Sequence, residues 1–283
     1  MPTTVIMVGN ETKEKEEKMS YIIGKVIIKG IIEVKTGMRI GGTPTGLKIG
    51  GVDLNVITDV NDKPYIPGSS LRGKLRTLLE RKEKVDWNKK DKKGRPIGHQ
   101  CENGNAYINC AVCKIFGLLS TPEFNTPTLT RLIVRDIYLD ETSITPEMKK
   151  NLELEWTEVK FETAINRITG TALDGSLRQA ERVPPGAKFH DCELIFNIYE
   201  EGDKDLLKKV FESLDMLKDD YLGGMGSRGY GKVEFKDIEI YYNKASDYET
   251  GQTELKPERK INGNWTTPAQ IVEHFKEIKA KLQ

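Results

Sequence analysis

Alternating apolar and polar positions mark four strands along this chain. The segment Gly24–Gly37 (GKVIIKGIIEVKTG) alternates well enough to predict one long strand. Two further runs, LTRLIVRDIYL at Leu129–Leu139 and CELIFNIYE at Cys192–Glu200, predict two more. The fourth strand follows a glycine-rich turn within Leu222–Tyr242 (LGGMGSRGYGKVEFKDIEIYY).

Apolar positions at helical spacing predict three helices. The first helix follows the turn PGSS at 67–70, and we expect Ser69 or Ser70 to be its N-cap. Its apolar stripe consists of Leu71, Leu75, Leu78 and Leu79. The segment KDLLKKVFESLDMLKD predicts a second, amphipathic helix, and PAQIVEHFKEIKAKLQ predicts a terminal one.

The order of these elements is β-α-β, an insertion, and β-α-β, which predicts an α+β fold with a split βαβ, ferredoxin-like sheet. One domain would span 20–242, after a charged, flexible leader at 1–19 and before a polar C-terminal extension at 243–283. Two insertions interrupt it, at about 84–118 and about 158–190. The second contains FETAINRITGTALDGSLRQAERVPPGAKF, whose small, polar and basic residues predict a protruding hairpin.

Composition narrows the partners and the compartment. Hydrophobic residues make up 37% of the chain and charged residues 31%, and no apolar run approaches the roughly 20 residues of a membrane helix. The N-terminus has no secretory pattern, so we expect a cytoplasmic protein with no membrane partner. The net charge of +1 argues against binding nucleic acid by bulk charge. Ser69–Arg95 nevertheless carries eleven Lys and Arg against four acids, a local charge of +7 (11 − 4).

One group of residues has the spacing of a metal site. His99, Cys101, Cys110 and Cys113 form the pattern H-x-C-x8-C-x2-C. Thiolates and imidazole suit tetrahedral zinc, and four protein ligands leave no open position for catalysis, so we expect structural Zn²⁺. The alternative is a set of buried thiols, which the polar surroundings disfavour. Cys192 stands alone on a strand and is expected to be a core residue.

Two turns could hold phosphate. GMGSRG at 224–229 matches G-x-G-x-x-G but precedes a strand, so it is not a dinucleotide fingerprint. Its glycines either make a tight turn or let backbone amides approach a phosphate beside Arg228. The helix after PGSS offers free amides at its N-terminus and carries Arg72, Lys74 and Arg76 in its first turns. The alternative for this helix is a solvated basic face.

Two aspartates, Asp53 and Asp59, lie at the end of the Gly-rich stretch GGTPTGLKIGGVD and just after it. Loop aspartates usually cap turns, but an aspartate can also hold a divalent cation at a phosphodiester or accept a proton from a ribose hydroxyl. Local sequence does not separate these alternatives. With only three His in the chain, imidazole-based ribonuclease chemistry is disfavoured.

Five motifs together resemble a known family. In chain order they are GVD, PYIPGSSLRGKLRTLLE, C-x2-C-K-I-F-G, INRITGTALDGSLRQAERVPPGAKF and LGGMGSRGYGKV. They are similar to motifs of the repeated backbone subunit of type III-A CRISPR effector complexes, a branch of the RAMP superfamily. The resemblance covers Gly24 to Tyr241.

The resemblance implies an RRM-like palm, whose copies stack with other type III subunits along a CRISPR RNA. A thumb from each copy crosses the guide–target duplex. Asp53 matches the family's cleaving aspartate, which implies endoribonuclease activity on guide-paired target RNA, dependent on Mg²⁺ or Mn²⁺. A 2′-hydroxyl would attack its own phosphate, leaving a cyclic phosphate and a 5′-hydroxyl.

The resemblance also implies which residues bind RNA. Those expected on the palm are Ser69, Ser70, Arg72, Lys74, Arg76, Gly224, Gly226 and Arg228, and those on the thumb are Arg167, Arg178 and Arg182. The chain departs from the family pattern after Asp53, where Leu54-Asn55 replaces an Asn-Pro-like step, and at Val60, where the family has Pro. The alternative is therefore a catalytically inactive, structural RNA-binding paralogue, as in type III-D complexes. A stand-alone guide-processing ribonuclease is a third possibility, which the scarcity of His disfavours.

Overall fold

The computed structural model describes residues 21–42, 52–118 and 128–283, so the predicted leader and most of the Gly-rich stretch lie outside it. Its centre is a six-stranded sheet in the order β10-β1-β9-β6-β2, with β5 also paired to β9. Strand β1 (Gly24–Val34) lies between β9 (Lys188–Ile198) and β10 (Val233–Lys244), and both pairings are antiparallel. The short strands are β2 (Tyr65–Ile66), β5 (Leu132–Val134) and β6 (Ile137–Leu139). The fold is thus α+β with an antiparallel sheet, as the hydrophobic pattern predicts.

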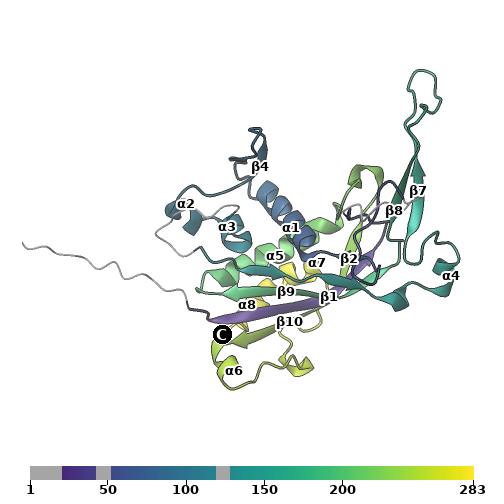
Figure 1. The fold of residues 1–283 in the computed structure, drawn as a ribbon. Helices are drawn as coiled ribbons and strands as arrows, with labels where there is room; N and C mark the ends of the chain where they lie inside the picture. The colour runs from purple at the N-terminus through teal and green to yellow at the C-terminus, as the bar shows by residue number, and fades with distance from the viewer. Residues whose placement is uncertain (1–20, 43–51, 119–127) are drawn as a thin grey trace, which may run out of the picture.

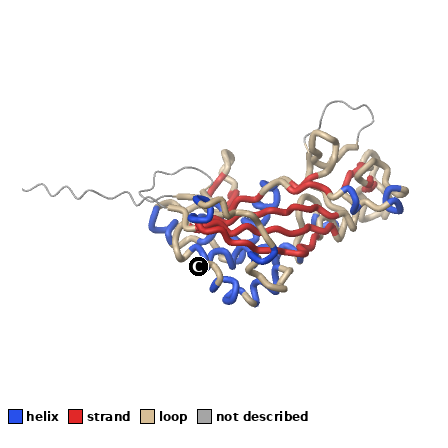
Figure 2. Tube along the Cα trace, turned by 90° about the horizontal axis from the view of Figure 1, so that it is seen from below, coloured by secondary structure: helices blue, strands red, loops and turns tan. Residues whose placement is uncertain are grey.

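The two long helices lie on the same side of this sheet (Figures 1 and 2). Helix α1 (Gly68–Lys82) follows β2, and α5 (Asp203–Lys218) joins β9 to the turn before β10. Their apolar stripes, including Leu71 and Leu75 of α1 and Phe211 of α5, are buried with Val26 and Phe196 of the sheet in one hydrophobic core. Burial of the stripe rather than helix propensity therefore holds each helix in place.

The sheet is bent at two β-bulges. The β1–β10 register shifts between Lys29 and Ile31, and the β1–β9 register shifts between Gly30 and Ile32. The partner strands each carry an aspartate with positive φ at this level, Asp237 at 51° and Asp191 at 54°. Aspartate adopts this left-handed conformation more readily than most residues, which accommodates the extra residue of a bulge.

Two boundary predictions are wrong, and one contact explains both. The N-cap of α1 is Pro67, not Ser69 or Ser70, and no side chain of the helix's own sequence caps it. The Gly68 amide instead donates to Asp136 Oδ1 at 2.7 Å. Asp136 lies between β5 and β6, so the predicted single strand Leu129–Leu139 is broken where the chain turns to cap α1. Gly68 is required there, because a Cβ would lie 2.2 Å from the carbonyl oxygen of Val134.

The first insertion contains the hairpin of β3 (Lys89–Lys90) and β4 (Pro96–Gly98), then α2 (Gly104–Ile108) and α3 (Ala111–Phe116). The second insertion contains the hairpin of β7 (Glu158–Glu162) and β8 (Arg178–Arg182), which projects from the molecule (Figure 1). The remaining short elements are η1 (Glu141–Ser143), α4 (Pro146–Lys149) and η2 (Gly226–Arg228). This hairpin lies within the segment whose small and polar residues predict a protrusion.

The C-terminal extension covers the outer edge of β10. It contains α6 (Ala245–Glu249), η3 (Pro257–Arg259), α7 (Pro268–Glu273) and α8 (Phe275–Ala280). The predicted single terminal helix is thus two helices, which meet at His274, whose ring stacks on Trp265 with 4.4 Å between ring centroids. The buried side chain of Asn262 accepts from the Ile240 amide and donates to the Ile238 carbonyl, so β10 has partners for its outward groups. No helix in the described ranges is long and apolar enough to cross a membrane.

Candidate RNA-cleaving site and metal centre

Asp53 lies at the base of the projecting hairpin β7–β8. The segment that contains it meets β8 at a single parallel bridge, in which the Leu54 amide donates to the Gln179 carbonyl at 3.1 Å and the Glu181 amide donates to the Leu54 carbonyl at 2.9 Å. Asp53 Oδ2 accepts from the Gln179 amide at 2.9 Å, and the residue is exposed. One carboxylate oxygen is thus used to fix the side chain, and no bond to the other is found among the described residues. A fixed, accessible carboxylate oxygen can bind a hydrated divalent cation or accept a proton.

Glu181 fastens this segment from the hairpin side. Its Oε2 accepts from the Val56 amide at 2.8 Å, and its Oε1 accepts from the Thr157 hydroxyl at 2.7 Å. Thr157 is buried and Val56 is part of the core. One carboxylate therefore joins the Asp53 segment, β8 and the chain just before β7.

We expect Glu181→Ala to lower the free energy of unfolding by about 1–3 kcal/mol, because the Val56 amide and the Thr157 hydroxyl lose their acceptor. Chemical denaturation of the purified chain measures this change. Glu147→Ala, at an exposed position with no such bonds through its side chain among the described residues, is the control and should change stability by less than about 0.5 kcal/mol. Equal stability of the two variants would contradict the anchoring role.

Asp59 has a different role from Asp53, although both are loop aspartates. Its Oδ1 accepts from the amides of Asn61 at 2.8 Å and Lys63 at 3.0 Å, which closes its own turn. The turn-capping alternative therefore describes Asp59. Asp53 differs because its bond reaches a segment 126 residues away along the chain.

The three arginines of the projecting hairpin that are predicted to bind RNA have different surroundings. Arg178 and Arg182 form ion pairs across the strands, with Glu162 at 2.9 Å and Glu158 at 2.6 Å. Arg167 is exposed near the tip, with no partner among the described residues. The hairpin also exposes large apolar side chains, namely Phe161, Ile165, Ile168, Leu173 and Leu177, of which Ile168 is 96% exposed. Such a projection can offer both charge and an apolar wedge to a nucleic acid.

The glycines of the turn before β10 are needed for close packing. A Cβ on Gly226 would lie 2.0 Å from the Tyr221 ring, and a Cβ on Gly223, which has φ of +86°, would lie 2.2 Å from the Arg39 carbonyl oxygen. The Gly224 amide donates to that same carbonyl at 2.8 Å. The tight-turn alternative thus accounts for Gly223 and Gly226 without a phosphate, whereas a Cβ on Gly224 would meet nothing nearer than 3.8 Å. Arg228 is exposed.

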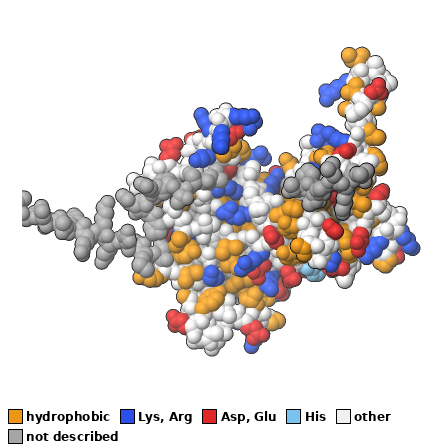
Figure 3. All heavy atoms as spheres, viewed as in Figure 1, with side chains coloured by type: hydrophobic (Ala, Val, Ile, Leu, Met, Phe, Trp, Pro, Cys, Tyr) orange, Lys and Arg blue, Asp and Glu red, His pale blue; other side chains and the backbone are white. Residues whose placement is uncertain are grey.

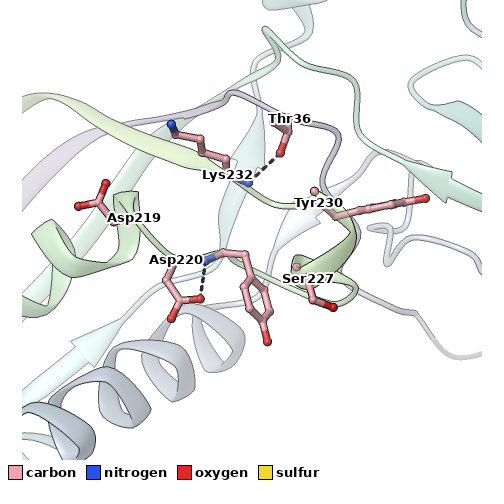
Figure 4. A pocket seen from close by; sticks show the side chains of 9 residues that line it. Thr36, Asp219, Asp220, Ser227, Tyr230 and Lys232 are labelled. Atoms are coloured by element: carbon pink, nitrogen blue, oxygen red, sulfur yellow. Dashed lines mark hydrogen bonds between the residues drawn. The ribbon is translucent and has the colours of Figure 1, made fainter.

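A hollow of about 350 Å³ lies beside this turn, between the end of α5 and the start of β10 (Figure 4). In Figure 4 the Lys232 amide donates to the Thr36 hydroxyl at 3.0 Å and the Tyr221 amide to Asp220 Oδ1 at 2.8 Å. Because Asp219 and Asp220 line the hollow with Lys232, it is of mixed charge. Exposed Arg228 and Lys232 beside the hollow, rather than the hollow itself, suit contact with an RNA backbone.

The basic residues of α1 are largely occupied by contacts within the protein. Lys74 pairs with Asp220 at 2.9 Å and lies 3.8 Å from the centroid of the Tyr221 ring, which brings α1 against the glycine-rich turn. Arg72 donates to the Phe116 carbonyl, and desolvation by burial lowers the pKa of its guanidinium. Ser69 is exposed and Ser70 half-buried at the start of the helix.

Arg76 is buried, and its side chain organises the metal-binding insertion. Its guanidinium donates to Glu80 Oε1 at 2.8 Å, to the Gly117 carbonyl at 2.9 Å and to the His99 carbonyl at 2.7 Å. Because all of these acceptors belong to the protein and the side chain is 9% exposed, we leave Arg76 out of the RNA-binding set. Helical periodicity predicts that Arg76 lies on the basic face of α1. It does not reveal that the metal-binding insertion packs over this face and buries the side chain.

Arg39 is a basic residue of this region that the sequence analysis missed. Its guanidinium lies close to two glycines: a Cβ built on Gly41 would be 3.2 Å from it, and a Cβ built on Gly224 would be 3.8 Å from it. Arg39 therefore lies next to the glycine-rich turn before β10. Its Nε is buried without a hydrogen-bond partner among the described residues. The only available signal was an Arg directly before Ile40-Gly41-Gly42, at the end of a long strand.

The four predicted metal ligands converge in space. The ligand atoms of His99, Cys101, Cys110 and Cys113 all lie within 4.8 Å of one another. His99 Nε2 lies 3.6 Å from Cys101 Sγ and 3.4 Å from Cys110 Sγ. The edge of a tetrahedron of thiolates around zinc is about 3.8 Å, given a Zn–S distance of about 2.3 Å. The group therefore has the size and donor atoms of a four-ligand metal site.

Neighbouring groups orient the histidine for metal binding. His99 Nδ1 lies 2.9 Å from the Asp86 carbonyl oxygen. Because a carbonyl only accepts, Nδ1 carries the proton and Nε2 presents its lone pair to the thiols. The amide of the same histidine donates to Glu80 Oε1 at 3.3 Å. This pattern of outer hydrogen bonds is typical of metal-ligating histidines.

The thiols share protons when no cation neutralises them. A hydrogen bond from Cys113 lowers the pKa of Cys110 to about 5, and burial raises the pKa of Cys101 to about 11. The hydrogen bond that Cys113 donates to Cys110 also raises the pKa of Cys113 itself. A bound divalent cation would stabilise all three thiolates, so ion binding would release protons. Cys192 lies apart, buried in β9, where burial raises its pKa to about 12.

Comparison with known proteins agrees with the resemblance inferred from sequence. A family model described as the RAMP superfamily matches residues 31–234. A protein of Methanocaldococcus jannaschii named CRISPR system Cms endoribonuclease Csm3 is 45% identical over 238 residues, which are 84% of this chain and 89% of that protein. A protein of the same name from Methanothermobacter thermautotrophicus is 39% identical over 225 residues, which are 76% of this chain and 84% of that protein.

A solved structure is similar as well. A chain in the crystal structure of the Csm3–Csm4 subcomplex in the type III-A CRISPR-Cas interference complex superposes with a TM-score of 0.55. It is 33% identical, and the match covers 91% of this chain and 97% of that one.

Proposed function

This chain belongs to the RAMP superfamily, and on that basis we propose that it is the guide-binding backbone subunit of a type III CRISPR interference complex and an endoribonuclease that cuts complementary target RNA. The observation that carries the proposal is the position of Asp53, an exposed carboxylate bonded to the backbone of the projecting hairpin. The residue proposed to cleave RNA thus lies next to the hairpin proposed to contact it. Copies stack along the guide in the cytoplasm, together with other subunits of the complex.

The palm is ferredoxin-like in this proposal. In its favour, α1 lies between β1 and β5 in the chain, α5 lies between β9 and β10, and β1 separates β10 from β9 in the sheet. These are the features of a split βαβ unit with two helices on one side. The hairpin β7–β8 acts as the thumb, and its apolar tip displaces a base pair of the guide–target duplex.

The guide backbone lies across the side of the palm that carries the α1 N-terminus and the glycine-rich turn. The residues proposed to contact it are Ser69, Ser70, Arg72, Lys74, Gly224, Gly226 and Arg228, with Arg167, Arg178 and Arg182 on the thumb, and Arg39 is added from its position. Exposed Arg228 and Arg167 are the strongest of these, because no protein partner satisfies them in the described ranges. Base pairing with the guide, not the protein, selects the target sequence, which suits a near-neutral chain.

Cleavage occurs beside the nucleotide that the thumb displaces. The 2′-oxygen forms a bond to its own phosphorus, the bond to the 5′-oxygen of the next nucleotide breaks, and the hydroxyl proton is lost as a proton is gained by the leaving oxygen. A divalent cation, Mg²⁺ or Mn²⁺, would stabilise the charge on the phosphate. Asp53, through its accessible oxygen, holds that cation or takes the proton of the 2′-hydroxyl. The fixed bond to Gln179 keeps the carboxylate oriented.

The metal of the Cys/His group is zinc with a structural role. Three sulfur atoms and one imidazole nitrogen favour Zn²⁺ over Mg²⁺ or Mn²⁺, and the four protein ligands leave no position for substrate. His99, Cys101, Cys110 and Cys113 would hold the ion, and Arg76 with Glu80 would hold the loop to α1. The two metals therefore have separate sites and separate roles.

Target RNA added to the guide-loaded complex tests this function. We expect regularly spaced cuts in complementary RNA with Mg²⁺ or Mn²⁺, and products that end in a 2′,3′-cyclic phosphate and a 5′-hydroxyl. Mass spectrometry of the fragments reads the ends, and a non-complementary RNA is the control. Binding without any cutting would support the second candidate, an inactive structural paralogue, which the departure at Leu54-Asn55 favours.

A further inference from the structure

The basic segment Ser69–Arg95 has two structurally different halves. In α1, cations contact protein groups: Arg76 binds Glu80, Lys74 binds Asp220 and Lys82 binds Glu212. Past the helix, the β3–β4 hairpin carries five cations and one acid, a local charge of +4 (5 − 1), namely Lys89, Lys90, Lys92, Lys93, Arg95 and Asp91. The hairpin therefore carries much of the segment's charge that no acid neutralises, although Arg72 and Arg81 of α1 also lack an acidic partner among the described residues.

The single acid of the hairpin closes its turn. Asp91 Oδ1 accepts from the amides of Lys93 at 2.8 Å and Arg95 at 2.9 Å, and its Oδ2 pairs with the Arg95 guanidinium at 2.7 Å. Lys90, Lys92 and Lys93 are exposed, and none has a side-chain partner in the part of the chain that the structure describes. Three ammonium groups are thus displayed on one short turn.

The hairpin is joined firmly to the metal-binding loop. The Asn88 side chain accepts from the Gln100 amide at 3.0 Å and donates to the Gln100 carbonyl at 2.9 Å. Gln100 lies between His99 and Cys101, two residues of the Cys/His group. Trp87, 37% exposed at the base, lies 6.0 Å from the Arg81 guanidinium and adds an aromatic surface. Aromatic rings beside cations are typical of surfaces that bind RNA strands.

The hairpin and the thumb project from the same side of the molecule. Figure 1 shows β4 and the β7–β8 hairpin rising on that side with α1 between them, and Figure 3 shows Lys and Arg gathered at the tip above β4. A polyanion that lies along the α1 side of the palm toward the thumb would therefore pass the hairpin as well. Basic residues on the opposite side of the molecule would not lie along this path.

We propose that the β3–β4 hairpin is a further RNA-backbone site, in which Lys90, Lys92 and Lys93 bind phosphates of the strand that lies across the palm. The inference rests on the proposed function, since it takes the ligand to be RNA. It adds to the palm and thumb contacts a third one, at the end of the palm away from the thumb. A metal ion bound in the insertion would then hold the β3–β4 hairpin in a fixed position.

The test is RNA binding by the full chain with Lys90, Lys92 and Lys93 changed to Gln. The probe is a fluorescent single-stranded RNA of mixed sequence, titrated at several salt concentrations. Loss of three phosphate contacts should reduce the slope of log K against log salt by about 2 and weaken binding about 100-fold near 0.1 M salt. The matched control changes three exposed lysines of the C-terminal extension, Lys244, Lys256 and Lys276, to Gln.

A second variant separates charge from structure. Changing the same three lysines to Arg should keep wild-type affinity and salt slope, and metal content should be equal in all variants. If the wild-type chain binds RNA and the Gln variant of the hairpin behaves like the C-terminal control, the hairpin assignment is overturned while the proposed function stands. If the wild-type chain binds neither this probe nor a guide RNA, the proposed function fails first.

Discussion

Asp53→Ala is expected to slow target-RNA cleavage by the guide-loaded complex at least about 100-fold while target binding is unchanged. The factor is that of losing a positioned acid–base group or a metal-holding carboxylate from a phosphodiester reaction. Binding should survive because, among the described residues, Asp53 has no cationic partner and its one bond is to the Gln179 amide. Single-turnover cleavage and filter binding measure the two quantities separately.

Two conservative variants sharpen this result. Asp53→Asn keeps an oxygen for the Gln179 amide but removes the charge, so it should lose cleavage nearly as fully as Asp53→Ala. Asp59→Asn makes the same change on the neighbouring loop, where the side chain accepts only from its own turn, and should cleave within about twofold of wild type. Equal activity of Asp53→Asn and wild type would assign the chemistry to another residue.

Removal of the structural metal is expected to have the largest effect on stability. The purified wild-type chain should contain one zinc per chain, and Cys110→Ser should contain almost none, because one of four ligands is lost. Cys110 is also the N-cap of α3, so the insertion at 84–118 should lose its protection from hydrogen exchange. A loss of about 3–5 kcal/mol would lower the melting temperature by about 10 °C.

The control for this prediction is Cys192→Ala, which removes a buried thiol outside the group and should keep the zinc. Acid should release the metal, because His99 and the thiols bind zinc only when deprotonated, so the zinc content falls as pH decreases through the titration of bound ligands. Full zinc content in Cys110→Ser, measured by elemental analysis, would show that the group is not a four-ligand site. Cleavage restored by Mg²⁺ after mild chelation, with zinc retained, would separate the two metals.

The strand and helix patterns were readable in sequence because each element has its own apolar period. Apolar and polar residues alternate along Gly24–Val34, which forms the long strand β1. The apolar stripe from Leu71 to Leu79 is the buried side of α1. The ends of elements were less predictable. The cap of α1 comes from Asp136, 68 residues away, and the same residue interrupts the strand predicted at 129–139. Contacts between distant residues override local preference at such positions.

Sequence alone identified the family, through motifs in a fixed order, and the candidate metal ligands, through the close spacing of His99, Cys101, Cys110 and Cys113. The partners and the exposure of the loop aspartates and of the basic residues were visible in the tertiary structure alone. Asp53 bonds to the β7–β8 hairpin and Asp59 only to its own turn, while Arg76 is buried and Lys90, Lys92 and Lys93 have no side-chain partner among the described residues. Charge and residue type are properties of sequence, but accessibility and partners depend on which distant segments pack together.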